Sequence, residues 1–534
     1  MKTSTLKKSL VAITTAALVS VFAVAIPSSA SAATTCVNDK LTVKGKLVSF
    51  QKCTGTDDRG SKYEIRMPAK FNGTMMLYSH GIRYPFALPA LGLTYNDAPD
   101  IAPSAEVSEQ LLAQGFALAG AGVQVQGWNQ TEQVYASLFV NNAARTQFPS
   151  IDKVVAWGQS LGALSTQAMV EQYPGLFDAV GPLCLAESAS AEITGFLDFI
   201  WGLKTFFDPT IKGSGYSAGQ AGLVELQTDI SKAVAIFTFL SNEFTVNPLT
   251  PGWPTTATTA TALISAGLPS RSAMLMIGLM SGIPTQSKSF DSSSGPVGPL
   301  ETAFGGLLSP VLAVLENGSE AAVLGFIANY DLEVRAGGRI YDNTNTDYVA
   351  RLGADAEIFT SGLSGASKGL AGFGAFLNKL NPGAPRVKAD PDALARHNQL
   401  YQLQGKITAP TVTLTALADH ITPPGATQYL VDQYASSVSK GDSSKGLLVN
   451  IWNKPPDEYT TFTGQTPDKK TVAVNGVGHC NFTTSQYMAV AKLLAASAKS
   501  GKAPTTKAVS AAIKNDSNLF VDPNYRAPLL KYRQ

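Results

Sequence analysis

The residue best suited to nucleophilic chemistry in this sequence is Ser160, within the pentapeptide Gly158-Gln159-Ser160-Leu161-Gly162. The apolar run 154–157 precedes the pentapeptide, and the helix-forming stretch 163–169 follows it. A serine between two glycines at a strand-to-helix turn lies on strained backbone and presents its hydroxyl outward. A serine hydroxyl is a weak nucleophile, so it needs a base within hydrogen-bond reach.

The candidate base is His479, one of four histidines in the chain. It lies in a glycine-rich loop, 475–479, directly after an expected last strand, 471–474. The other histidines fit the role less well. His397 is expected at a solvated position of the helical stretch 391–403, and His80 ends an early strand and suits an oxyanion loop. His420 adjoins an aspartate, so that one of the two must point away from a shared site.

The candidate acid that would orient this base is Asp419, at the end of the expected strand 411–418. An open α/β sheet places its site residues at the carboxyl ends of parallel strands, and Pro423 and Pro424 stiffen the loop that follows. Asp152 and Asp178 are weaker candidates, because both are expected on the opposite edge or on the surface.

The order Ser160, Asp419, His479 is the Ser…Asp…His order of the α/β-hydrolase family, which the chain resembles over residues 60–186 and 400–500. The resemblance implies a Ser-His-Asp triad and an oxyanion hole formed by backbone N–H groups. The matching positions are Leu161, after the serine, and Ile82, in the loop that begins with His80-Gly81. Ile82 and Arg83 replace further glycines of the family pattern, so Gly81 is an alternative second donor.

The four cysteines, Cys36, Cys53, Cys184 and Cys480, are an even number, which in an exported protein favours two disulfides. Cys36 and Cys53 flank the run 41–50, an expected N-terminal hairpin, so a local bridge is the simplest of three possible pairings and leaves Cys184 with Cys480. Secreted tannases and feruloyl esterases are similar in having a cysteine directly after the catalytic histidine. Their partner cysteine directly precedes the serine, where this chain has Gln159, and we do not assign the chain to them on sequence.

The elements that must position these residues are those of a doubly wound, mostly parallel α/β sheet. Apolar strands alternate with helical stretches over residues 63–185: strands at 63–67, 74–79, 116–123, 153–157 and 179–185, and helices at 104–114, 138–145 and 164–173. Long helical stretches then replace this alternation. We predict a first core part over residues 33–186, an inserted helical cap over 187–394, and a second core part over 395–534 that closes with a helix at 486–498.

Residues 1–32 have the pattern of a secretory signal peptide: three lysines, an apolar run over residues 10–26 and the small-residue end Ala30-Ser31-Ala32. Cleavage after Ala32 would give a secreted protein. The whole chain carries 41 basic and 39 acidic side chains, and three of the lysines lie in this segment, so the remainder is nearly neutral. Neither nucleic acid nor anionic lipid is therefore an expected partner. We expect no stable membrane insertion, because no later segment reads as long and apolar enough to span a bilayer.

These features together predict a secreted serine hydrolase that cleaves carboxylic esters, with a small-molecule or polymeric ester as its substrate. A peptidase or amidase of the same fold is the alternative, and acidic cap residues would then hold a substrate amino terminus (Glu316, Glu320, Asp331 and Glu333). A non-catalytic binding module on this scaffold is a third possibility. We predict no cofactor and no metal, and we interpret the oxygen-rich segment 342–347 as a turn rather than a calcium loop. The sequence makes no prediction of oligomeric state.

Overall fold

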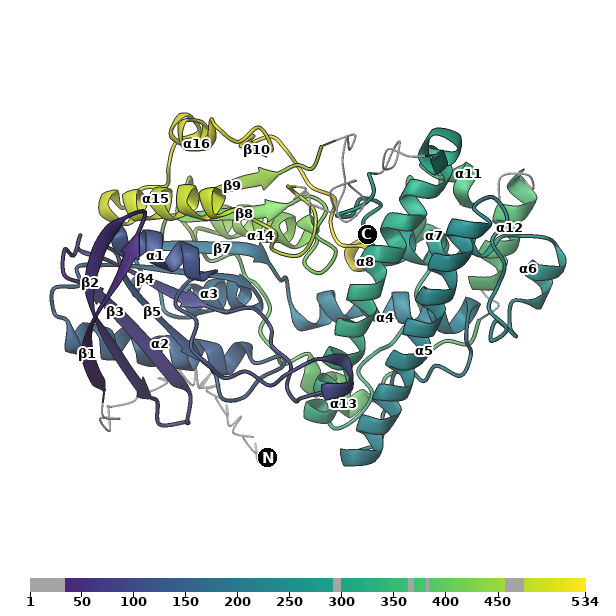
Figure 1. Ribbon diagram of the computed structural model, residues 1–534, viewed down its shortest axis with the longest axis horizontal. Coiled ribbons are helices and arrows are strands. Elements are labelled where there is room, and N and C mark those ends of the chain that lie inside the picture. The colour runs from purple at the N-terminus through teal and green to yellow at the C-terminus, as the bar shows by residue number, and fades with distance from the viewer. Residues whose placement is uncertain (1–33, 292–298, 364–368, 381–383, 457–474) are drawn as a thin grey trace, which may run out of the picture.

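The computed structural model describes residues 34–291, 299–363, 369–380, 384–456 and 475–534 (Figure 1). The predicted signal peptide, residues 1–32, and the predicted strand 471–474 lie outside the described residues.

A ten-stranded sheet forms the core, in the order β1-β2-β3-β5-β4-β6-β7-β8-β9-β10. Its strands from β5 to β9 in this order are parallel, whereas β1, β2, β3 and β10 pair antiparallel with their neighbours. The central strands are buried along their whole length, because helices cover both faces of a parallel sheet. The strands are β1 (Thr35–Val43), β2 (Lys46–Thr56), β3 (Lys62–Pro68), β4 (Thr74–Ser79), β5 (Ala117–Gly122), β6 (Lys153–Ser160), β7 (Ala179–Leu185), β8 (Thr411–Ala416), β9 (Leu448–Asn453) and β10 (Leu519–Phe520).

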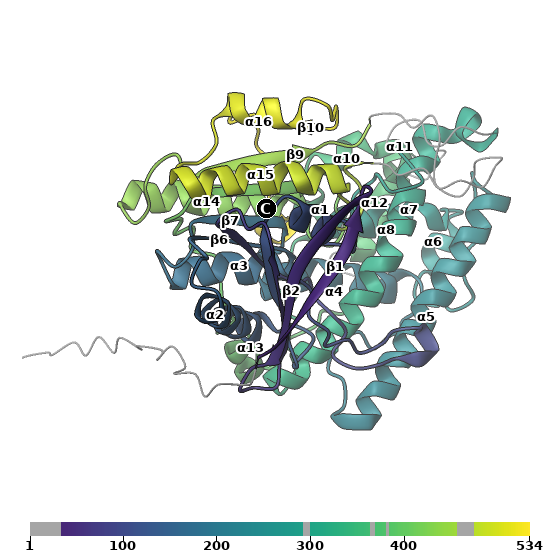
Figure 2. The ribbon, with the colours of Figure 1, turned by 60° about the vertical axis from the view of Figure 1, so that its left-hand side comes forward.

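Helices pack on the two faces of the sheet as separate layers (Figure 2). One apolar cluster joins the sheet to α1 (Ala105–Ala113), α15 (Thr484–Ser500) and α16 (Thr506–Ile513). A second cluster joins the other face to α2 (Gln130–Gln147) and α3 (Leu161–Gln172). Helix α14 (Pro424–Lys440) packs against β7 and β8, and α13 (Pro391–His397) packs against α8 (Pro299–Ala336). This strand order, with helices on both faces and a helical insertion, is the predicted α/β-hydrolase fold.

The insertion lies between β7 and β8, and its described elements are helices joined by loops. They pack beside one end of the sheet around their own apolar cluster (Figure 1). Its helices are α4 (Ala189–Phe206), α5 (Gly219–Val246), α6 (Thr261–Ser265), α7 (Ser270–Ser281), α8 (Pro299–Ala336), α9 (Tyr348–Leu352), α10 (Asp355–Ile358), α11 (Thr360–Leu363) and α12 (Gly369–Leu380). We refer to this group of helices as the cap.

The longest cap helix, α8, corrects one sequence expectation. By length and composition, its stretch Leu308–Ala336 is long and apolar enough to cross a membrane, whereas the sequence was expected to hold no such segment after residue 32. Its most apolar window is 67% buried inside the protein. Cap helices α4, α5 and α7 pack against α8. The apolar character of α8 is therefore that of a core helix.

Candidate active site

Ser160 lies at the turn where β6 ends and α3 begins, with φ 58° and ψ −126°. A non-glycine residue at such a φ is strained, and strain of this kind gathers at functional sites. The flanking glycines permit the close packing around the turn. A Cβ on Gly158 would come within 2.5 Å of the Gly162 carbonyl oxygen, and one on Gly162 within 2.2 Å of the Ser79 carbonyl oxygen. Side chains at either position would push the strand and the helix apart.

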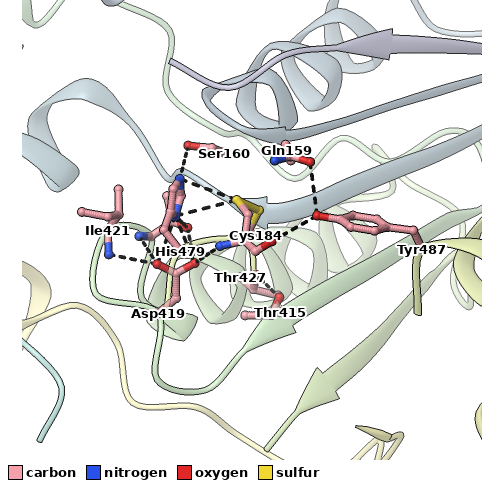
Figure 3. Close-up of a disulfide and its surroundings, with 11 residues drawn as sticks. Gln159, Ser160, Cys184, Thr415, Asp419, Ile421, Thr427, His479 and Tyr487 are labelled. Atoms are coloured by element: carbon pink, nitrogen blue, oxygen red, sulfur yellow. Dashed lines mark hydrogen bonds and ion pairs between the residues drawn. A yellow bond between two sulfur atoms is a disulfide. The ribbon is translucent and has the colours of Figure 1, made fainter. Parts of the chain in front are cut away.

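The structure brings Ser160, His479 and Asp419 into one hydrogen-bonded chain (Figure 3). His479 Nε2 lies 2.9 Å from Ser160 Oγ, and His479 Nδ1 lies 3.1 Å from each carboxylate oxygen of Asp419. The serine and the aspartate are buried, while the histidine side chain is 25% exposed. A proton can therefore pass from the serine hydroxyl to the imidazole, and the carboxylate faces the imidazolium that would result.

Backbone N–H groups hold the Asp419 carboxylate in place. Ile421 and Thr422 donate to Oδ1 at 2.9 and 3.0 Å, and Cys480 donates to Oδ2 at 3.1 Å. Burial by itself raises the pKa of Asp419, but the charge and the hydrogen bond of His479, the charge of His420 and the Thr422 N–H outweigh it, so the net pKa is lowered. Asp419 is thus an ionised carboxylate although its side chain is fully buried.

A disulfide between Cys184 and Cys480 lies directly beside the imidazole, and Cys36 pairs with Cys53 across the β1–β2 hairpin. Gln159 of β6 faces Leu183 of β7, and the next pair is Ser160 with Leu185, so Cys184 is the extra residue of a β-bulge. Both cysteines of this bridge have positive φ, 40° at Cys184 and 47° at Cys480. The bulge therefore places the partner cysteine of Cys480 on β7, beside Gln159, and not at position 159, directly before the serine.

The hydroxyl of Tyr487 on α15 lies within hydrogen-bond distance of both the Cys480 loop and Gln159 of β6. Its hydroxyl lies 3.1 Å from the Cys480 carbonyl oxygen and 3.3 Å from Gln159 Oε1. Burial raises the pKa of Tyr487, so that the hydroxyl stays protonated and can donate to either acceptor. Sequence reasoning missed this residue, because a helical tyrosine carries no local sign that its hydroxyl reaches a distant loop.

The expected oxyanion donors lie next to the serine. Leu161 is the first residue of α3, where the backbone N–H has no partner within the helix. A Cβ on Gly81 would lie 3.3 Å from Ser160 Cβ, which places the loop that contains Ile82 against the nucleophile. Among the residues that the structure describes, no group accepts from the Ile82 N–H.

His80 fixes the peptide unit that joins Gly81 to Ile82. Its Nδ1 lies 2.6 Å from the Gly81 carbonyl oxygen. Burial, aided by the Arg83 charge, lowers the pKa of His80 to about 4, so the ring is neutral and donates from Nδ1. The N–H of a trans peptide points opposite to its carbonyl, so this bond directs the Ile82 N–H away from His80.

The remaining two histidines do not contact Ser160. His397 is buried at the end of α13, not solvated as expected, and burial lowers its pKa to about 4. The reason is that α13 packs against α8 of the cap. His420 is the one of the adjacent pair Asp419-His420 that points away from the site. Its Nε2 lies 2.9 Å from Oε2 of Glu320 on α8. This contact ties the loop of the acid to the cap.

A cavity of about 650 Å³ opens onto His479 between the core and the cap. Its walls are the loop that follows β4, one side of α5 and one side of α8. The lining residues are Ile82, Arg83, Tyr84, Pro85, Gly127, Val234, Phe237, Thr238, Ser319, Glu320, Val323, Leu324, Ile327, Ala328, Asp331, Ile421 and His479. Most of these side chains are apolar, so the cavity suits a substrate with an apolar part.

The four acidic cap residues weighed for peptide binding do not gather in one place. Glu316 accepts hydrogen bonds from Ser287 and Ser289, and Glu333 accepts from the backbone of Gly215 and Tyr216. Only Glu320 and Asp331 line the cavity, at residues eleven positions apart on α8.

Asp419, His479 and Cys480 also have ligand atoms within 4.8 Å of one another, a spacing compatible with a metal ion. The sulfur of Cys480 is bonded to Cys184, however, and backbone N–H groups and His479 already engage the Asp419 oxygens. A disulfide sulfur is a poor metal ligand because it carries no thiolate charge. The donor set therefore fits proton transfer better than metal binding.

Comparison with known proteins yields one family match. Residues 57–218, which include the Ser160 turn, match a family described as a tannase-like family of unknown function. No curated protein matches the chain.

Several solved structures of esterases align with most of the chain at low similarity. Feruloyl esterase B from Aspergillus oryzae has a TM-score of 0.41 and 12% identity, over 88% of this chain and 87% of that one. Tannin acyl hydrolase from Aspergillus niger has a TM-score of 0.38 and 11% identity, over 88% of this chain and 83% of that one. An esterase from Aspergillus oryzae has a TM-score of 0.38 and 11% identity, over 81% of this chain and 80% of that one. The strand order and the Ser160 turn, independently of these alignments, give the chain the α/β-hydrolase fold with a helical cap.

Proposed function

We propose that the protein is a secreted serine hydrolase that cleaves carboxylic esters through an acyl-enzyme. The observation that carries the proposal is the continuous hydrogen-bonded chain from Ser160 through His479 to Asp419. The match of residues 57–218 to a tannase-like family supports an ester as the substrate.

In the proposed reaction, Ser160 Oγ attacks the acyl carbon while His479 Nε2 takes the hydroxyl proton. The N–H groups of Leu161 and Ile82 hold the oxyanion of the tetrahedral intermediate. The intermediate collapses when the alcohol leaves with the proton from His479, and the acyl group stays on Ser160. Water then attacks the acyl-enzyme with His479 as its base, which releases the acid and restores the serine.

Asp419 stabilises the imidazolium at both stages and keeps the proton of neutral His479 on Nδ1. We also propose that residues 1–32 are a cleaved signal peptide and that residues 187–394 act as the cap that selects the substrate. The disulfides Cys36–Cys53 and Cys184–Cys480 support export, because such bonds persist in oxidising compartments. Expression with the full leader should yield protein in the medium that begins at residue 33 by N-terminal sequencing.

The decisive experiment compares the wild type with Ser160→Ala in hydrolysis of a nitrophenyl acetate and in labelling by a fluorophosphonate probe. Both signals should vanish in Ser160→Ala. Ser165→Ala is a matched control, since Ser165 is a buried serine of α3 whose hydroxyl donates to the Leu161 carbonyl. Full hydrolysis by Ser160→Ala, or a wild type that neither labels nor hydrolyses, would refute the proposal.

A peptidase or amidase would need a group that binds the amino terminus of its substrate. Glu320 is the acidic cavity residue that interacts with the charge of His479. It already bonds to His420, however, and Lys288 Nζ lies 3.8 Å from its Oε1. We therefore favour the ester. Rates on aminoacyl nitroanilides that exceed those on the matching esters would reverse this preference.

A further inference from the structure

The cavity beside His479 is elongated along one helix. Its lining residues on α8 fall on a single face at the spacing of successive turns: 319 and 320, 323 and 324, 327 and 328, and then 331. From Glu320 to Asp331 the helix rises by about 16 Å, at about 1.5 Å per residue. We call this elongated cavity the α8 trench.

The opposite wall of the trench comes from α5, which packs beside α8 (Figure 1). Val234, Phe237 and Thr238 line it, again at the spacing of one helical face. Val234 is 44% exposed, so the trench borders solvent on this side. At the far end, Asp331 accepts from the Trp128 N–H and lies against Gly127, where a Cβ would come within 2.2 Å of the carboxylate.

The charged groups on the trench walls already have partners within the protein. Arg83 pairs with Asp100 at 2.5 Å, and Asp331 pairs with Arg335 at 3.0 Å. Glu320 bonds to His420. The middle of the trench between these groups is lined by Val323, Leu324, Ile327 and Ala328. The trench is therefore suited to a neutral, apolar and extended group rather than to a charged one.

We propose that the α8 trench binds an extended aliphatic acyl chain of the ester substrate. A methylene advances an extended chain by about 1.25 Å, from a bond of about 1.5 Å and an angle of about 111°. A trench of about 16 Å therefore holds roughly 10 to 13 carbon atoms. An acyl group with a single aromatic ring would leave its far part empty.

The acyl side of the ester, rather than the alcohol, is assigned to the trench because of the loop that lines its entrance. The acyl carbon carries the oxygen that the Ile82 N–H would hold, and the trench wall continues from Ile82 through Arg83, Tyr84 and Pro85. This inference rests on the proposed function, since it needs an acyl group on Ser160.

The test is a chain-length series of nitrophenyl esters from acetate to hexadecanoate, with kcat/KM measured for each. In the wild type, kcat/KM should rise by up to about fourfold per methylene and level off at roughly 10 to 13 carbons. Val323 lies three residues from Glu320, about 4.5 Å along the helix, so Val323→Trp should move the maximum to about four carbons. The ratio of decanoate to acetate kcat/KM should fall by up to about 4,000-fold, because six methylenes lose a contact worth up to about fourfold each.

A second variant checks the spacing. Ala328 lies eight residues from Glu320, about 12 Å along the helix, so Ala328→Leu should shorten the optimum only slightly, to about ten carbons. Val334→Trp is the control, because Val334 is 57% exposed on the same helix and does not line the trench. Its profile should match that of the wild type.

A flat wild-type profile, or an unchanged optimum in a folded Val323→Trp variant, would overturn the inference. A second series, acetates of alcohols from ethanol to dodecanol, would overturn the acyl assignment if chain length mattered there instead. In each case wild-type hydrolysis of nitrophenyl acetate and its loss in Ser160→Ala would still uphold the proposed function. A wild type that hydrolyses no ester of either series would overturn both.

Discussion

Removal of the Cys184–Cys480 disulfide should change both stability and catalysis, because Cys480 directly follows the proposed base. The perturbation is the double variant Cys184→Ala with Cys480→Ala. The matched control is Cys36→Ala with Cys53→Ala, which removes the hairpin disulfide far from His479.

The size of the stability change follows from two opposing effects. The cysteines are 296 residues apart at the site and 17 apart in the hairpin, for which chain entropy gives about 5.7 and about 3.2 kcal/mol. Loss of the site disulfide also lets residues 184 and 480 leave their strained, positive φ values. This relief offsets the loss of stability by about 1–3 kcal/mol at each residue. We therefore expect the site variant to lose about 0 to 4 kcal/mol of unfolding free energy and the hairpin variant about 3 kcal/mol.

Catalysis should separate the two variants. Without Cys480 fixed to the bulge, the His479 loop gains freedom, and a displacement of about 1 Å can lower a rate by about 100-fold. Chemical denaturation would measure the free energy of unfolding, and hydrolysis of nitrophenyl acetate would measure kcat. We expect kcat to fall by roughly 10- to 100-fold in the site variant and to be unchanged in the hairpin variant. Equal kcat values in both variants would refute the positioning role of the disulfide.

Three single substitutions test other parts of the site. Asp419→Asn should lower kcat by about 10⁴-fold, since the amide would donate to His479 Nδ1 and leave the proton on the wrong nitrogen; a fall under tenfold would contradict this role. His80→Phe should lower kcat by roughly 10²- to 10³-fold with KM little changed, because the Gly81 carbonyl loses its donor and the oxyanion N–H its orientation. A KM effect alone would argue against this. Burial raises the pKa of Glu192 well above 4.5, so the folded protein favours the protonated carboxyl. The contribution of Glu192 to the stability of the fold is therefore complete at acid pH and declines as the pH rises. Glu192→Gln should therefore raise the melting temperature at neutral pH and leave it unchanged below about pH 4, and a lower melting temperature at pH 7 would contradict the sign.

Elements with strong local patterns were predictable from the sequence. The strand expected at 74–79 is β4 with the same bounds, and the helix expected at 104–114 is α1 at Ala105–Ala113. The strand β9 was not predicted, because Asn450 interrupts its apolar run. Nor was α14, whose sequence is largely polar and which begins at the second of two prolines. For these elements, tertiary packing outweighs local preference.

The sequence pointed to the three residues of the candidate site but not to the network of contacts around them. Chain order and loop position pointed to Ser160, Asp419 and His479, which the fold brings together although the serine and the histidine are 319 residues apart. The contacts of His420 with Glu320 and of Tyr487 with Gln159 depend on how the cap and α15 pack. No local pattern encodes such packing.

The position of the cap within the chain also bears on how the protein folds. Val180 of β7 pairs with Thr411 of β8, so the two parts of the sheet join only across the whole insertion. Contacts between residues so distant in sequence form slowly, and the cap has time to fold first. Until β8 arrives, β7 is an open apolar edge that invites aggregation. The thiol of Cys184 is then also unpaired, and early formation of the local Cys36–Cys53 disulfide would remove the two cysteines with which it could mispair.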